Sequence, residues 1–141
     1  MVRQISLRNA IPVKLIASCG LNCRLCRAYI RKRNPCPGCR AGDENKSGTC
    51  LSCRIKNCDK ISDGLRYCFS CDNFPCDIVD RLDNRYRKKY GISVIQNLKS
   101  IKAEGIRQFI RKERIKWRCP ECNAMICVHK PQCVVCGHYW R

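Results

Sequence analysis

Cysteine is the residue type that gives this sequence most of its chemical potential, because the chain holds sixteen cysteines among 141 residues. Eleven of them fall between Cys19 and Cys76, several as C-x2-C pairs. Thiolates at this spacing readily share one metal ion, whereas such close pairs are poorly placed for a disulfide bridge. A reducing compartment also favours metal ligation. The sequence therefore predicts thiolate metal sites, with a disulfide framework as the lesser alternative.

The clearest metal-binding pattern lies near the C-terminus, where two C-x2-C pairs are separated by ten residues. Flanked by Trp117 and Trp140, this pattern resembles a zinc ribbon, in which two short hairpins bind one ion. Four thiolates leave no open coordination position, so we expect a structural ion without catalysis, with both tryptophans packed beside it. The predicted ligands are Cys119, Cys122, Cys133 and Cys136.

The N-terminal cysteines can be grouped in more than one way, and spacing alone leaves the connectivity open. One grouping joins two pairs nine residues apart: Cys23, Cys26, Cys36 and Cys39. Another joins equivalent positions of an internal C-x2-C-x4-C repeat: Cys50, Cys53, Cys68 and Cys71. The predicted ligands that these groupings leave over are Cys19, Cys58 and Cys76. Cys127 and His129 are candidates for a missing ligand, and we expect about three zinc ions in the whole chain.

An iron–sulfur cluster is the minority alternative for the first of these cysteines. Cys19, Cys23 and Cys26 have the spacing of the cluster-binding loop in radical S-adenosylmethionine enzymes. Those enzymes need a large α/β barrel after the loop, and this chain has no room for one. Leu25 also stands where an aromatic residue usually precedes the third cysteine. A cluster that serves a redox role without that enzyme chemistry remains open.

The chain is strongly basic, with 29 Lys and Arg against 11 Asp and Glu, a formal net charge of +18. Three tetrathiolate zinc sites would lower this charge to about +12. A polyanionic partner is the natural inference, RNA in preference to DNA, and a solubilising surface is the alternative. The candidate contacts are Arg24, Arg27, Arg31, Lys32, Arg33, Arg87, Lys88, Lys89, Arg111, Lys112 and Arg114.

After Cys76 the sequence has fewer cysteines, and its apolar residues recur at a spacing that predicts helices. Apolar residues from Ile78 to Tyr90 recur at helical spacing and predict an amphipathic helix that Gly91 ends. Ser93 is a good N-cap for a second helix ending at Gly105, and a third helix is expected over residues 106–115. Residues 1–18 are expected to form an extended lead-in, with a short strand over 13–16.

Together these features predict a small, metal-stabilised α+β protein in three parts. Residues 1–76 form a cysteine-rich multi-metal zinc lobe, residues 77–118 form two to three basic amphipathic helices, and residues 119–141 form a zinc ribbon. The ordered motifs C-G-L-N-C-R-L-C, C-P-G-C, C-F-S-C-D-N-F-P-C, L-D-N-R-Y-R-K-K-Y-G and W-R-C-P-E-C support one conjoined architecture. They resemble, over about Cys19 to Gly137, a family of small cysteine-rich bacterial and archaeal proteins catalogued as a domain of unknown function. The resemblance implies bound metal and no particular activity.

The sequence therefore favours a zinc-stabilised protein that binds nucleic acid. A zinc-dependent adaptor for a protein partner, as in a ribonucleoprotein assembly, is the alternative. The sequence has no paired-carboxylate, Ser-His-Asp or phosphate-loop signature, so a non-enzymatic role is favoured. No apolar stretch approaches the roughly 20 residues of a membrane helix. The first eighteen residues lack the pattern of a signal peptide. We therefore expect a cytoplasmic protein without membrane contact.

Overall fold

The structure, a computed structural model, describes residues 9–141 and is built around three consecutive helices. These are α5 (Asp77–Tyr90), α6 (Val94–Glu104) and α7 (Ile106–Lys116). The shorter helices that precede them are η1 (Val13–Leu15), η2 (Cys23–Leu25), α2 (Arg27–Ile30), α3 (Gly48–Leu51), α4 (Asp59–Ser62) and η3 (Cys68–Ser70). The three helices predicted after Cys76 are thus confirmed.

The ends of the three long helices follow from the residues that were expected to cap them. Gly91 adopts a left-handed conformation (φ 68°, ψ 24°) at the C-terminus of α5, and its N–H donates to the carbonyls of Arg87 and Tyr86. Ser93 then caps α6 by accepting the N–H of Gln96 at 3.1 Å. A single residue, Gly105, separates α6 from α7, and its φ of 88° and ψ of 157° suit only glycine.

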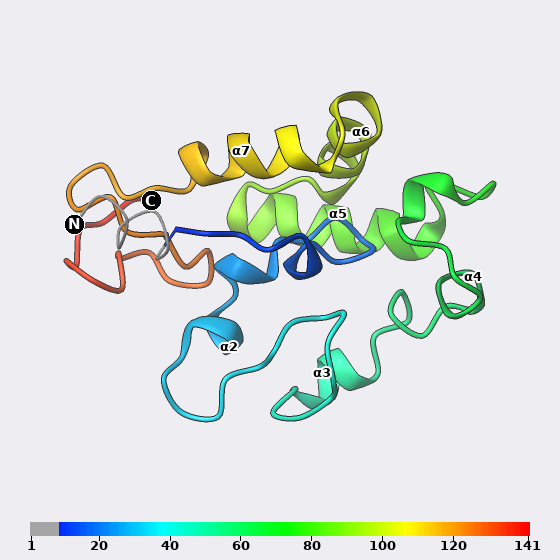
Figure 1. The fold of residues 1–141 in the computed structure, drawn as a ribbon, viewed down its shortest axis with the longest axis horizontal. Helices are drawn as coiled ribbons and strands as arrows, with labels where there is room; N and C mark the ends of the chain where they lie inside the picture. Colours follow the sequence, from blue (N-terminus) through cyan, green and yellow to red (C-terminus); the bar gives the residue numbers. More distant parts are fainter. Residues whose placement is uncertain (1–8) are drawn as a thin grey trace.

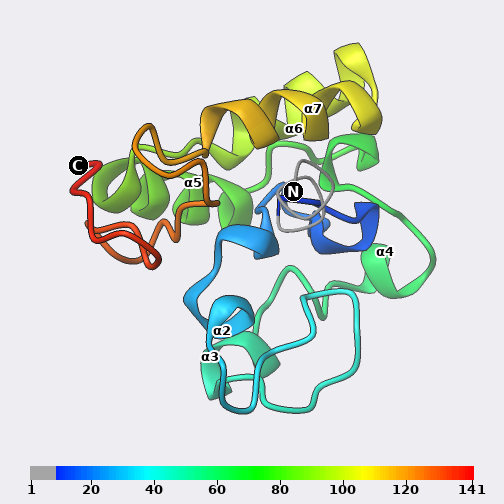
Figure 2. The same cartoon turned by 60° about the vertical axis from the view of Figure 1, so that its left-hand side comes forward.

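The long helices form a layer in which α6 packs against both α5 and α7. Helices α5 and α7 run in the same direction along the long axis of the molecule (Figure 1). The C-terminal ends of α5 and α7 therefore lie at the same end of the molecule, beside the loops of residues 117–141. The short helix α4 lies at the opposite end in both views (Figures 1 and 2).

The hydrophobic core lies between this layer and two segments distant in sequence. Val94, Leu98 and Phe109 supply the helical side. From the N-terminal side come Ile16 and Leu25, each at most 2% exposed. The C-terminal loops add a second set of buried side chains, namely Trp117, Met125, Ile126 and Val128. The backbone pairs these two segments directly, because the N–H of Val128 donates to the carbonyl of Leu25 at 3.0 Å.

The expected lead-in differs from the structure over its described part, residues 9–18, and its start lies outside the described residues. Residues Val13–Leu15 form a 3-10 helix instead of a strand, after Pro12 has set its first turn. Ile16 pairs with Asn22 only as an isolated β-bridge, because the chain reverses at Gly20. Gly20 has a φ of 90°, and a Cβ there would lie 2.9 Å from the carbonyl oxygen of Val94. The segment is therefore folded tightly into the core.

The β component of the predicted α+β class is correspondingly small. Over residues 9–141 the β structure consists of isolated bridges, Ile16 with Asn22, Arg118 with Met125, and Gln132 with Tyr139. The spacing of C-x2-C pairs suggested hairpin strands, but the turns that hold such pairs are too short for a ladder. The described chain is thus a small helical protein with few strand-like contacts.

The cysteine-rich segment from residue 26 to residue 66 extends away from this core, below the helical layer in Figure 1. Its buried residues are Cys36, Gly38 and Ile55. Gly38 takes a φ of 110° inside the C-P-G-C turn, a conformation that glycine adopts readily. Hydrophobic burial is therefore scarce in this segment. Within the described residues, no helix has the length and hydrophobicity needed to cross a bilayer.

Candidate metal centre

The four cysteines of the two C-terminal pairs come together in one cluster. Their Sγ atoms all lie within 4.8 Å of one another. The Sγ atoms of Cys119 and Cys136 are 3.7 Å apart, and those of Cys122 and Cys133 are 3.6 Å apart. Four thiolates bound tetrahedrally to one ion at about 2.3 Å would have sulfur atoms about 3.8 Å apart. The cluster therefore has the size and donor set to hold a metal ion, which confirms the coarse prediction of a metal site there.

Two turns of equivalent backbone geometry position these thiols. In the first, the N–H of Cys119 donates to the carbonyl of Ala124 at 2.8 Å and the N–H of Asn123 donates back to Cys119 at 2.9 Å. The second turn repeats these bonds from Cys133 to His138 at 2.7 Å and from Gly137 to Cys133 at 3.0 Å. Each turn needs a left-handed residue just after its second cysteine, which is why asparagine and glycine occupy those places.

Backbone N–H groups favour the ionised form of one of these thiols. Burial opposes ionisation of Cys133, but N–H groups of Cys136 and Val135 and the neighbouring thiols of Cys122 and Cys119 outweigh it and lower the pKa of Cys133 to about 7. The N–H of Val135 lies 3.5 Å from the Cys133 sulfur. Since metals bind the thiolate, Cys133 is the member of the cluster most readily available as a ligand, whereas at Cys122 and Cys136 the backbone N–H groups are outweighed by burial and by hydrogen bonding among the thiols, which raise the pKa.

The two tryptophans flanking the cluster pack against each other. The Trp117 and Trp140 rings meet edge to face, with centroids 5.7 Å apart. Trp117 is buried, and its Nε1–H donates to Glu113 on α7 at 3.2 Å. Trp140 donates its Nε1–H to the carbonyl of Lys130 at 2.7 Å. The cluster is thus attached to the helical layer through Trp117.

Apart from Cys127, the remaining cysteines lie between Cys19 and Cys76, and no set of three of their sulfurs closes to within 4.8 Å in the described part of the chain. The first predicted grouping shares one neighbourhood. Burial, together with the neighbouring thiols of Cys39, Cys26 and Cys36, outweighs a backbone hydrogen bond from Cys39 and raises the pKa of Cys23 to about 12. The assignment of the N-terminal cysteines as ligands therefore remains a prediction, as does the iron–sulfur alternative.

His129 and Cys127 stand apart from the C-terminal cluster. The Nδ1 atom of His129 accepts the backbone N–H of Arg27 at 3.1 Å, so that nitrogen carries no proton. The imidazole also meets the ring of Tyr90 edge-on, with centroids 5.1 Å apart. Burial lowers the pKa of His129, and the charges of Arg27 and Arg141 lower it further. Cys127, two residues before His129, is buried in the core. His129 thus links α2 to the C-terminal loops and to α5.

The predicted nucleic-acid contacts lie mostly on the surface, and several already bind within the chain. Arg31 donates to the carbonyls of Asn34 and Asn45 and braces its own loop. Arg87 pairs with Asp83 at 2.8 Å, and Lys112 pairs with Glu104. Arg24 and Arg114 are half-buried. The other predicted contacts are exposed: Arg27, Lys32, Arg33, Lys88, Lys89 and Arg111.

Comparison with known proteins found one family model that matches part of the chain. Residues 15–81 match the model of a family described as a protein of unknown function, DUF3795. This match confirms the resemblance noted from the motifs, and the motifs beyond residue 81 lie outside it. A search of curated proteins returned no match, and a search of solved structures returned none. The cluster of Cys119, Cys122, Cys133 and Cys136 also lies outside the matched residues.

Proposed function

We propose that this protein is a zinc-stabilised binding module for RNA, with the C-terminal cluster as a zinc ribbon. The observation that carries the proposal is the convergence of basic helix ends on one end of the molecule. The last turns of α5 and α7 are both basic, with Arg87, Lys88 and Lys89 on one helix and Arg114 and Lys116 on the other. Because the two helices run in the same direction, these turns lie at the end of the molecule that holds the loops of residues 117–141 (Figure 1).

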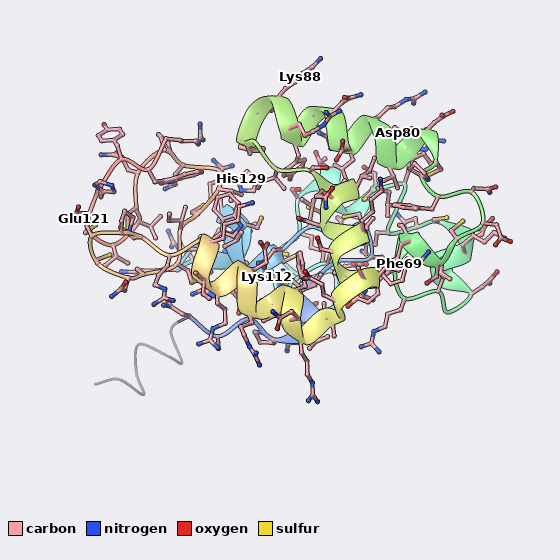
Figure 3. The ribbon with its side chains drawn as sticks, turned by 90° about the horizontal axis from the view of Figure 1, so that it is seen from above. Phe69, Asp80, Lys88, Lys112, Glu121 and His129 are labelled. Carbon is pink, nitrogen blue, oxygen red and sulfur yellow. The ribbon has the colours of Figure 1, made fainter. Side chains whose placement is uncertain are left out.

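The exposed side chains at this end are available to a polyanion. Figure 3 shows Lys88 pointing outward from α5, at the end nearer His129 and Glu121, while Asp80 marks the other end of the helix. Lys112 lies on α7 (Figure 3). Helix α2 and the basic loop after it, Arg31 to Arg33, are joined to the same region. The backbone N–H of Arg27, at the start of α2, donates to the Nδ1 atom of His129. Rigid metal-bound turns would hold these bases at fixed positions against phosphates.

The bases at helix C-termini also complement the helix dipole, which accounts for part of their placement. The dipole effect alone does not require exposed side chains on two helices and a loop at one end. We expect contacts to phosphate and RNA shape to dominate, because the chain carries none of the established base-reading motifs.

The test measures binding of the metal-loaded chain to a short fluorescein-labelled RNA hairpin between 50 and 200 mM salt. Affinity should fall steeply over this range, because bound counterions are released from the RNA. Replacing Lys88, Lys89 and Arg111 by glutamine should lower the slope of log affinity against log salt by about 2. The matched control replaces three exposed bases at the other end of the molecule, Lys60, Arg66 and Lys102, and should leave the slope nearly unchanged. Binding that is flat across the salt range, or equal losses in both variants, would contradict the proposal.

A second candidate function, a zinc-dependent adaptor for a protein partner, is favoured by apolar side chains exposed on the second C-terminal turn. Val134, Val135 and Tyr139 are 43%, 64% and 65% exposed. Apolar groups gathered on a rigid turn are a common feature of protein-binding surfaces. The adaptor role predicts a defined partner that stays bound after nuclease treatment and is lost when Val135 and Tyr139 are both replaced by serine. Loss of all capture after nuclease treatment argues for RNA instead.

A further inference from the structure

A second group of cysteines surrounds a cavity at the end of the molecule opposite the C-terminal cluster. The cavity has a volume of about 40 Å³. Its cysteines are Cys58, Cys68, Cys71 and Cys76. Most of the other lining residues are apolar, among them Ile55, Phe74 and Val79. Four thiols thus face one small, largely apolar space.

Local structure holds each of these cysteines at the end of a short turn or helix. Cys68 begins η3, and the N–H of Cys71 donates to its carbonyl at 3.1 Å. Cys76 is the N-cap residue of α5, and Cys58 precedes α4. The backbone of Cys68 is fixed to the core, because its N–H donates to the carbonyl of Ser18 at 2.9 Å. The four positions are therefore anchored to three elements and to the core.

The lining of the cavity distinguishes this set from the repeat-based one. Cys50 and Cys53, which the repeat spacing joined to Cys68 and Cys71, do not line this cavity. Cys53 instead lines a different cavity, together with Cys19 and Cys39. No three of the four sulfurs lie within 4.8 Å of one another, so the thiols must move closer together to bind one ion.

We propose that Cys58, Cys68, Cys71 and Cys76 bind one zinc-type divalent ion as a tetrathiolate site separate from the C-terminal cluster. Four cysteine thiolates are the ligand set of a structural zinc ion. An ion there would join α4 and η3 to the N-terminus of α5. This grouping replaces the repeat-based set of Cys50, Cys53, Cys68 and Cys71. It does not depend on RNA binding.

The test counts zinc per chain in the full-length protein, purified anaerobically and equilibrated with a competing chelator. Cys58→Ser and Cys71→Ser should each lose one equivalent relative to the parent, and the double variant should lose that same single equivalent. Combining Cys50→Ser with Cys71→Ser should instead lose the sum of the two single losses. Ser70→Ala is the matched control, because Ser70 is exposed within the same turn, and it should keep the parental ratio. A parental ratio in Cys58→Ser, or two equivalents lost in the Cys58 and Cys71 double variant, overturns the site.

A measurement on the unmodified chain covers the case in which these variants fail to fold. The zinc protein is treated with a thiol alkylating reagent while the chelator is raised stepwise, and labelled cysteines are located by mass spectrometry. The proposed site requires Cys58, Cys68, Cys71 and Cys76 to become reactive together as one ion leaves. If Cys50 and Cys53 become reactive with Cys68 and Cys71 while Cys58 is reactive from the start, the repeat-based grouping is correct. Iron and sulfide in place of zinc would also rule out the proposal.

Discussion

The carboxylate of Asp83 joins helix α5 to the start of α6. Its oxygens accept the hydroxyl of Ser93 at 2.6 Å, the N–H of Ile95 at 3.1 Å and the guanidinium of Arg87 at 2.8 Å. Burial alone would raise the pKa of Asp83, but the bonds from Ser93, Ile95 and Arg87 outweigh it and lower the pKa. A buried carboxylate with three donors is thus kept ionised in the folded state.

Replacing Asp83 by asparagine should therefore destabilise the fold by about 2 kcal/mol, because the amide faces donors with one of its own NH₂ hydrogens. The measurement is the free energy of unfolding in denaturant at neutral pH. Because the folded-state pKa is lowered, the stabilisation is complete above the unfolded pKa of about 3.9 and is lost as pH falls through the folded value. Asp72→Asn, an exposed site, is the control. Equal effects at both sites would show that Asp83 has no special role.

The pKa of Glu113 is shifted in the opposite direction from that of Asp83. Burial raises its pKa, although Asn22 and Trp117 donate to its oxygens at 3.5 and 3.2 Å. An acid whose folded pKa is raised is more protonated in the folded state, so its contribution to stability falls as pH rises from the unfolded to the folded value.

We therefore expect the stability of the parent, relative to Glu113→Gln, to decline as pH rises above about 4.3, the ordinary value for glutamate. Comparing the two proteins at each pH removes the shared pH dependence of metal binding. The readout is the difference in denaturation midpoint between the proteins at several pH values. A constant difference would show that folding leaves the pKa of Glu113 unchanged, and a parent that gains stability relative to the variant as pH rises would show that folding lowers this pKa.

At the scale of the elements, Gly105 makes the direct joint between α6 and α7. Its φ of 88° and ψ of 157° lie in a region that is almost closed to other residues. A Cβ built there meets no atom within 4 Å, so any cost of substitution comes from the backbone.

Gly105→Ala should therefore lower the free energy of unfolding by about 1–3 kcal/mol without steric repacking. Gly48→Ala is the matched control, because Gly48 lies in α3 with open space around its Cβ position and no positive φ. That substitution should be neutral or slightly stabilising, since alanine favours helix. Thermal unfolding of both variants checks the difference, and equal midpoints would contradict it.

Over the whole molecule, two regions depend on different sources of stability. Helices α5 to α7 share a hydrophobic core with residues 9–25 and 117–128. The segment 26–66 contributes Cys36, Gly38 and Ile55 as its buried residues. A segment with so little burial cannot offset its own chain entropy by the hydrophobic effect.

Removing metal with a strong chelator under reducing conditions should therefore unfold residues 26–66 while the three long helices keep part of their protection. Hydrogen exchange read by mass spectrometry distinguishes these regions in one experiment. Amides of residues 26–66 should approach the exchange rates of an unfolded chain, whereas those near Leu98 and Phe109 should stay slower. Retention of native exchange throughout residues 26–66 after complete metal loss would show that metal does not hold this segment.

Local patterns in the sequence were enough to predict the three long helices and the C-terminal cluster. The spacing of apolar residues and the capping residues Gly91, Ser93 and Gly105 determine where each helix begins and ends, and these effects reach only a few residues along the chain. Each C-x2-C pair likewise forms its own tight turn, so the C-terminal cluster could be predicted from local sequence. The same local signals could not reveal that residues 9–18 belong to the core, because those residues are buried by side chains from α6 and α7 far along the chain.

Only the tertiary structure decides which N-terminal cysteines are neighbours. The repeat spacing paired Cys50 and Cys53 with Cys68 and Cys71, but the path of the chain places Cys58 and Cys76 at the cavity instead. Spacing constrains thiols within one turn, whereas the joining of distant turns depends on how the helices and the core fold between them. The direction of α5 and α7, which gathers their basic ends at the end of the molecule that holds the loops of residues 117–141, is likewise a property of packing that no local pattern contains.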